Sequence, residues 1–226
     1  MENLLLCFSS FHVDSDPSNM REEEYAICYE QLLRVLPSNF DVVFIDNTTN
    51  ESVVSKRLYD IVDSHSHLFY DNNIGVDNKG LGELEMLNKA RGVFDFSKYR
   101  KISYFTGRRI VTCPYVFERT SNMNKNALIS NPPIIRINDG YIYPTNLSLY
   151  NDMFFSMKSN VMDEYCTYAN EVIESPDGRG SEQILYDFIN SHNIEYEWLD
   201  WLGFIRNDWE QSEKGYSRSE MNMQFC

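Results

Sequence analysis

The pattern of apolar runs and polar turns in the first half of the chain predicts three β-strands separated by two helices. Apolar runs at residues 4–8, 41–45 and 67–70 are each bounded by polar residues, as is typical of strands buried on both faces of a parallel sheet. Residues 21–35 and 53–62 between them carry apolar side chains at helical spacing. This order of strands and helices is the signature of a doubly wound α/β fold.

A fourth unit follows at residues 67–113, where a polar turn and a helix at residues 81–93 lead to a strand that ends in Thr106-Gly107-Arg108-Arg109. Ligands of open α/β sheets bind at the carboxyl ends of the strands. We therefore expect the residues that follow the four strands to meet at one edge of the sheet and to form the binding site. These are residues 9–11, 46–47, 71–75 and 106–109.

The second half of the chain has a less regular pattern, and its first part is rich in polar, aromatic and proline residues. A loop at residues 175–180 precedes a helix for which Ser181 is the predicted N-cap. The other elements that we expect are strands at residues 134–137, 141–143 and 194–198, and helices at residues 149–158 and 162–173.

The length of 226 residues suits one α/β domain, and an apolar fraction of 42% is ample for a packed core. We assign residues 1–207 to this domain, with a first half at 1–113 and a second half at 114–207. Residues 208–226 are polar and are predicted to form a tail.

The chain is acidic, with a net charge of −14 that argues against general affinity for nucleic acids or anionic membranes. Seven of its 20 Lys and Arg residues nevertheless lie between Lys89 and Arg109. This concentration of positive charge suggests a place for a phosphorylated ligand.

The five cysteines form no Cys-x-x-Cys pair, which fits neither a disulfide framework nor a zinc site. The apolar run near the start of the chain is too short for the hydrophobic part of a signal peptide. No run reaches the roughly 20 residues that a membrane span requires. We therefore expect a cytoplasmic protein without a transmembrane segment.

A strand that ends at Asp46-Asn47, the segment NNIGVDNKGLGELEMLNKA and a following strand with a polar end together resemble the GT-A fold of nucleotide-sugar glycosyltransferases. The resemblance is to the small bacterial or large-virus type and covers roughly residues 3–200. It implies a Rossmann-like, mostly parallel sheet flanked by helices, with an irregular second half on the acceptor side. The implied activity is transfer of a hexose or pentose from a nucleotide-sugar to a glycan or glycolipid, as in polysaccharide biosynthesis.

The resemblance also implies roles for particular residues at the strand ends. The first strand end would contact the nucleotide, an acid after the second strand would hold the base or ribose, and the Asn-x-Gly region would approach the ribose, diphosphate or donor sugar. The positions that match are Ser9, Ser10, Phe11, Asp46, Asn73, Gly75, Asn78 and Lys79.

One feature departs from the GT-A pattern, in which the fourth strand ends in an Asp-x-Asp that binds Mn²⁺ or Mg²⁺. Here that place reads Thr106-Gly107-Arg108-Arg109, and the literal Asp14-Ser15-Asp16 lies in the first loop. We therefore predict no metal ligands and a transferase that is independent of metal or only weakly dependent on it. Arg108, Arg109 and Lys79 are expected to neutralise the diphosphate, although side chains alternate along a strand and at most one arginine faces the ligand.

The resemblance places the catalytic base of an inverting enzyme at the start of a late helix, where a carboxylate removes the proton of the acceptor hydroxyl. Glu182 matches this place, and Asp139 is the second candidate. Plainer interpretations stay open, because Glu182 suits the first turn of any helix and Asp46 suits a turn. The sequence also leaves open a nucleotidyltransferase-like enzyme, although its first loop SSFHVDSD lacks the usual glycines and basic residue, and a non-catalytic module that binds nucleotides or sugars.

Overall fold

The computed structural model describes residues 2–13, 20–72, 74–76, 78–130, 135–138, 141–144, 150–199 and 204–206. Its helices are α1 (Met20–Val35), α2 (Lys56–Val62), α3 (Lys79–Val93), α4 (Tyr115–Asn122), α5 (Ser159–Glu174) and α6 (Ser181–Ser191), with short 3-10 turns η1 (Ile74–Val76) and η2 (Phe96–Lys98). Its strands are β1 (Asn3–Ser9), β2 (Phe40–Asp46), β3 (Ser66–Phe69), β4 (Lys101–Thr106), β5 (Arg109–Val111), β6 (Asn126–Ser130), β7 (Ile135–Asn138), β8 (Tyr141–Pro144), β9 (Tyr150–Lys158), β10 (Tyr196–Leu199) and β11 (Phe204–Arg206).

A seven-stranded sheet in the order β10-β6-β9-β4-β1-β2-β3 forms the centre of the fold. Strands β4, β1, β2 and β3 run parallel, whereas β9 lies antiparallel between β4 and β6. The pairs β5–β11 and β7–β8 form small antiparallel ribbons. The predicted α/β class and the parallel first half are therefore confirmed, and the four parallel strands end at one edge of the sheet.

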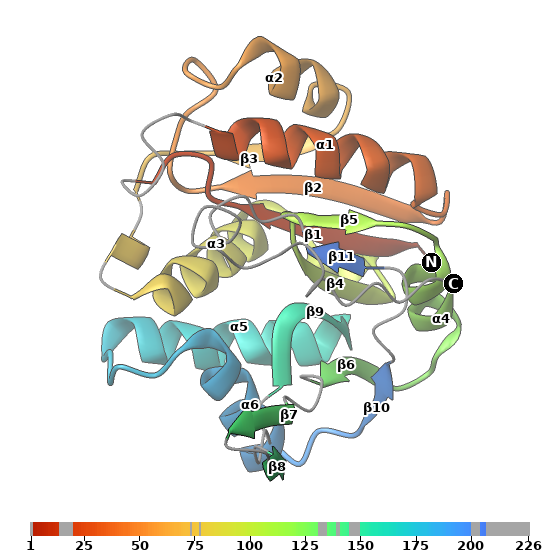
Figure 1. Ribbon diagram of the computed structural model, residues 1–226, viewed down its shortest axis with the longest axis vertical. Helices are drawn as coiled ribbons and strands as arrows, with labels where there is room; N and C mark the ends of the chain where they lie inside the picture. Colours follow the sequence, from red (N-terminus) through yellow and green to blue (C-terminus); the bar gives the residue numbers. More distant parts are fainter. Residues whose placement is uncertain are drawn as a thin grey trace.

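Helices cover both faces of this sheet (Figure 1), and each face has its own apolar core. Helices α3, α5 and α6 pack on one face, whereas α1, α2 and α4 pack on the other. Strand β1 contributes to both cores, because Leu4 and Leu6 face the first group of helices and Leu5 and Cys7 face the second. Burial on both faces explains its continuous apolar run.

Two predictions in the second half are wrong. A helix was expected at residues 149–158, but Tyr150–Lys158 form the inner strand β9, in which residues 153–157 are buried. A short run that is apolar on both faces suits a buried strand as well as a buried helix, so periodicity could not separate them. Ser181 is the first residue of α6 and not its N-cap, which is Gly180.

Elements α4 and β6 were not anticipated in the polar and aromatic segment that precedes residue 131. Within the part of the chain that the structure describes, no helix combines the length and apolar character needed to cross a membrane.

Candidate functional site

The ends of β1 and β2 are held together by the carboxylate of Asp46. Its Oδ2 accepts a hydrogen bond from Phe11 N at 2.8 Å, and its Oδ1 accepts from Thr48 N at 2.7 Å and from Thr48 Oγ1 at 2.6 Å. The side chain is fully buried. Burial raises the pKa of Asp46, and the hydrogen bonds from Thr48 and Phe11 oppose that rise. In this conformation Asp46 therefore fixes the two loops instead of facing solvent.

The three residues predicted to contact the nucleotide differ in exposure. Ser9 is buried and donates its hydroxyl to Ile45 O at 2.8 Å. Phe11 is also buried and packs edge-on against Phe69, with the ring centroids 5.4 Å apart. Ser10 is half-buried, and its backbone N–H donates to the Tyr25 hydroxyl at 3.0 Å. Of the three, Ser10 is the one with a surface that a ligand can reach.

The end of β2 is also joined to the first turns of α3. Asn47 Nδ2 donates to Gly82 O and to Glu85 Oε2, both at 3.3 Å. The Tyr70 hydroxyl, which follows β3, donates to the same Glu85 oxygen at 2.7 Å. The sequence did not lead us to expect these contacts of Tyr70 and Glu85. The available signal was an acid on the inward-facing side of a helix, where a charged side chain requires polar partners.

The N-terminus of α3 contacts the N-terminus of α6. Asn78 caps α3 by accepting from Gly80 N at 3.0 Å, and its Nδ2 donates to Arg179 O, 101 positions along the chain, at 3.0 Å. A Cβ placed on Gly80 would lie 2.6 Å from Ser181 N and 3.1 Å from the carbonyl carbon of Gly180. Only glycine permits this approach, so Gly80 is required by packing between the helices and not by a turn.

Lys79 and Glu182 flank this contact. Lys79 is the first residue of α3, its side chain is 82% exposed, and its Nζ lies 2.9 Å from Oε1 of the buried Glu83. Glu182 is the second residue of α6 and is half-buried. The structure therefore brings the start of α3, with Asn78 and Lys79 predicted to bind the donor, next to the start of α6, with the predicted base Glu182. Helix N-termini carry a partial positive charge, which together with Lys79 favours an anionic ligand here.

Arg179 fixes the loop that leads into α6. Its Nε donates to Asp177 Oδ2 at 2.7 Å, and its Nη1 donates to Asp187 Oδ2 at 2.6 Å and to the Tyr168 hydroxyl at 3.3 Å. The hydrogen bonds to Asp177, Tyr168 and Asp187 raise the pKa of Arg179. These contacts determine where α6 begins and so where Glu182 lies.

The two arginines that follow β4 contact residues of α1 and β9. Gly107 N donates to Phe8 O at 2.7 Å, and a Cβ on Gly107 would lie 2.7 Å from Tyr29 Cε1. Arg108 then forms an ion pair with Glu24 of α1, with 3.7 Å between Nη1 and Oε2 and side chains that are 17% and 3% exposed. Arg109 Nε lies 2.9 Å from Met153 Sδ of β9. Helix α1 packs on the face opposite α3 and α6, so these contacts do not join Arg108 to Lys79.

The concentration of basic residues between Lys89 and Arg109 is not a single patch in three dimensions. Arg91 pairs with Asp163 of α5, with 2.6 Å between Nε and Oδ1. Lys101 is buried at the other end of β4 from Arg108 and donates to Lys125 O at 2.6 Å. The positive charges are therefore spread over both ends of the sheet.

The predicted site residues that remain are placed as follows. Gly75 lies in the 3-10 turn η1 before α3 and is half-buried. Asn73, Asp139 and the Asp14-Ser15-Asp16 sequence lie outside the described residues. Within the described parts of the chain, no group of three or more His, Cys, Asp and Glu side chains is arranged to hold a metal ion. A hydroxyl, a glycine and two guanidinium groups at the end of β4 do not fit a divalent cation, which prefers oxygen anions.

Comparison with solved structures identifies the fold. No family model and no curated protein matches the sequence. Mouse xyloside xylosyltransferase 1 superposes with a TM-score of 0.54 at 11% identity, over 89% of this chain and 87% of that protein. A protein described as a nucleotide-diphospho-sugar transferase, from Desulfovibrio desulfuricans G20, gives 0.53 at 10% identity, over 88% of this chain and 80% of its own.

A third match is 4-diphosphocytidyl-2C-methyl-D-erythritol synthase from Anaerococcus prevotii DSM 20548, with a TM-score of 0.54 at 10% identity, over 88% of this chain and 86% of that one. Together with the mixed, mostly parallel sheet, these matches show that the chain has the GT-A fold of nucleotide-diphospho-sugar transferases. Identities this low establish the fold alone.

Proposed function

We propose that the chain is a glycosyltransferase that moves a hexose or pentose from a nucleotide-sugar to a glycan or glycolipid acceptor. The observation that carries the proposal is the contact between the N-termini of α3 and α6 at Gly80 and Ser181. It gathers a polar cap, a lysine and a carboxylate beside the carboxyl end of β2, which is where ligands of such sheets bind. Two of the three fold neighbours are described as sugar transferases.

In this proposal the donor diphosphate lies at the N-termini of α3 and α6. Backbone N–H groups of the first helical turns and the ammonium group of Lys79 supply charge-assisted hydrogen bonds to the leaving diphosphate. Ser10, Gly75 and Asn78 border the donor, while Asp46 acts by holding the loops at Phe11 and Thr48 in place. Arg108 and Arg109 contact Glu24 and Met153, so the proposal assigns them no contact with the diphosphate.

Glu182 is the proposed catalytic base of an inverting transfer. Its carboxylate takes the proton of the acceptor hydroxyl as that oxygen forms a bond to the anomeric carbon, and the bond from that carbon to the diphosphate breaks. Its position in the first turn of α6, next to the contact with α3, supports this role. Residues 1–113 then hold the nucleotide, and residues 114–207 supply the acceptor side, as in an enzyme of polysaccharide synthesis.

A nucleotidyltransferase-like activity is the second candidate, because a synthase with a diphosphocytidyl product in its name matches the fold as well as the sugar transferases do. Such an enzyme binds a nucleoside triphosphate as its substrate. A non-catalytic module with the same fold would bind a nucleotide or a sugar without transfer.

Isothermal titration with UDP-, GDP- and CMP-sugars and with CTP separates these functions. The proposal predicts that at least one nucleotide-sugar binds more tightly than CTP and that its sugar is transferred when glycan acceptors are added. Preferential binding of CTP would favour the second candidate, and binding without turnover would favour the third. Absence of nucleotide binding at about 1 mM would contradict the proposal.

A further inference from the structure

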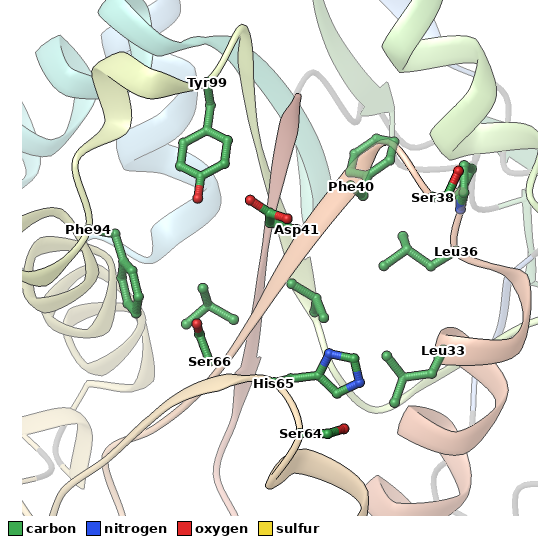
Figure 2. Close-up of a pocket in the computed structure, with 13 residues that line it drawn as sticks. Leu33, Leu36, Ser38, Phe40, Asp41, Ser64, His65, Ser66, Phe94 and Tyr99 are labelled. Carbon is green, nitrogen blue, oxygen red and sulfur yellow. The ribbon is translucent and has the colours of Figure 1, made fainter. Parts of the chain in front are cut away.

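A pocket of about 440 Å³ lies at the amino end of β2 (Figure 2), and no residue of the contact between the starts of α3 and α6 lines it. The first residues of β2, Phe40 to Val43, line it, whereas Asp46 at the other end of the strand lies in the candidate functional site. A strand rises by about 3.3 Å per residue, so Asp46 lies roughly 10–20 Å along the strand from the residues that line the pocket. The pocket is therefore separate from the proposed donor site.

The register of the sheet explains why this space is open. Strand β3 begins at Ser66, which pairs with Val43, so Phe40, Asp41 and Val42 extend beyond the start of β3. Phe94 and Tyr99 lie on one side of β2, and Leu33 of α1 and Leu36, just after this helix, lie on the other (Figure 2). The loop before β3, with Ser64 and His65, closes the third side.

The lining combines ring and aliphatic surfaces with hydroxyl, imidazole and carboxylate groups. The polar side chains are Ser38, Asp41, Ser64, His65, Ser66 and Tyr99. Asp41 is exposed, and the Tyr99 hydroxyl points toward its carboxylate. Burial and the hydrogen bond to Asp41 raise the pKa of Tyr99, so its hydroxyl stays protonated. None of the described residues that line the pocket is Lys or Arg.

We propose that this pocket binds a neutral saccharide unit. The C–H face of a sugar ring packs on apolar and aromatic surface, as provided by Phe94 and Tyr99, while its hydroxyls donate to a carboxylate and exchange hydrogen bonds with serine hydroxyls. The volume falls within the roughly 300–1,000 Å³ of small-molecule sites. An anionic ligand is disfavoured, because Asp41 and the net charge of −14 would repel it.

The choice of a saccharide over another neutral ligand rests on the proposed function. A glycan acceptor that extends over the protein surface would place a remote sugar in this pocket and the reacting sugar beside Glu182. A quaternary ammonium ion would use the aromatic surface and Asp41 but would leave the hydroxyl-rich part of the lining unsatisfied. These differences make the ligand class testable.

The test is isothermal titration of the full chain with maltose, lactose and cellobiose, with glucuronate and choline as charged probes. We expect at least one disaccharide to bind, with affinity about tenfold lower in Asp41→Asn and about fivefold lower in Tyr99→Phe. Asp60→Asn and Tyr115→Phe change the same residue types outside the pocket and are expected to leave the affinity unchanged.

Three results would overturn the inference. These are no disaccharide binding at about 10 mM, preferential binding of glucuronate or choline, and disaccharide binding that Asp41→Asn leaves as tight as before. Titration of the same variants with nucleotide-sugars separates this inference from the proposed function. Disaccharide binding without nucleotide-sugar binding would support the saccharide pocket and contradict the proposed transferase. Nucleotide-sugar binding without disaccharide binding would support the transferase and contradict the saccharide pocket.

Discussion

Gly80 of α3 and Ser181 of α6 lie in direct backbone contact, so close that a Cβ on Gly80 would stand 2.6 Å from Ser181 N. The hydrogen bond from Asn78 Nδ2 to Arg179 O, at 3.0 Å, holds the same two segments together. This contact between distant parts of the chain brings the start of α3, which holds Lys79, next to the start of α6, which holds Glu182. The proposed donor site depends on this contact.

Gly80→Ala is expected to lower the free energy of unfolding by about 1–3 kcal/mol, because the added methyl group meets a backbone atom that cannot move aside alone. Urea denaturation measures this change. Gly92→Ala in the same helix is the matched control, since a Cβ there has no neighbouring atom within 4 Å. It is expected to raise stability by about 0.5–1 kcal/mol through helix propensity. Equal effects of the two changes would show that the close approach is absent in solution.

Glu182→Gln is expected to reduce the rate of sugar transfer by about 100-fold or more, because the amide cannot accept the proton of the acceptor. Donor affinity, measured by titration, should change little. Glu118→Gln is the control, because Glu118 also lies in the first turn of a helix, α4, and has the same relation to a helix dipole. A Glu182→Gln protein that kept the wild-type transfer rate would exclude this residue as the base.

Removal of divalent metal is expected to leave turnover unchanged. The end of β4 and the residues after it offer Thr106, Gly107 and two arginines and no acidic ligand, and in the proposed site the helix N-termini and Lys79 neutralise the diphosphate. The measurement is the transfer rate after treatment with EDTA. Loss of activity that Mn²⁺ or Mg²⁺ restores would contradict this part of the account.

The buried Lys101 is expected to make the stability of the protein rise with pH in the alkaline range. Burial, followed by the charges of Arg100 and Lys158, lowers its pKa from 10.5 to about 8. Between these values the unfolded chain holds a proton that the folded chain has lost, so rising pH favours the folded state. We expect the stability of the wild type relative to Lys101→Met to increase by about 1–2 kcal/mol from about pH 7.5 to about pH 9.5.

Urea denaturation of both proteins at the two pH values measures this difference. Lys98→Met, which removes an exposed lysine nearby in the sequence, is the control for the loss of a lysine side chain. A constant difference between the wild type and Lys101→Met would mean that Lys101 keeps its ordinary pKa in the folded protein.

The parallel half of the fold was predictable because burial on both faces leaves a direct mark in the sequence. Leu4 to Phe8 is continuously apolar since it forms the inner strand β1. The same reasoning failed at β9, where Met153, Phe154 and Phe155 are buried on the two faces of a strand but also suit a buried helix. Tertiary pairing with β4 and β6, which the sequence does not reveal, decides between them.

The candidate site was predictable only in part. The positions of Asn78, Lys79 and Glu182 follow from strand and helix ends, but their proximity depends on a contact that spans 101 positions. The sequence also did not reveal the ion pair of Arg108 with Glu24. Adjacent residues near a strand end point to opposite faces, and the sequence does not show which of the two arginines points to which face. Charge clusters in a sequence therefore need not be clusters in space, as Lys101 and Arg108 at opposite ends of β4 show.

The most direct test of the central claim is titration of a nucleotide-sugar into Lys79→Met and Lys56→Met. Both lysines are highly exposed, at 82% and 86%, and both pair with an acid four positions later, so the changes to helix and charge are matched. The account predicts that Lys79→Met weakens donor binding about tenfold and that Lys56→Met leaves it unchanged. Equal affinities in the two variants, or no nucleotide-sugar binding by the wild type, would contradict the placement of the donor at the start of α3.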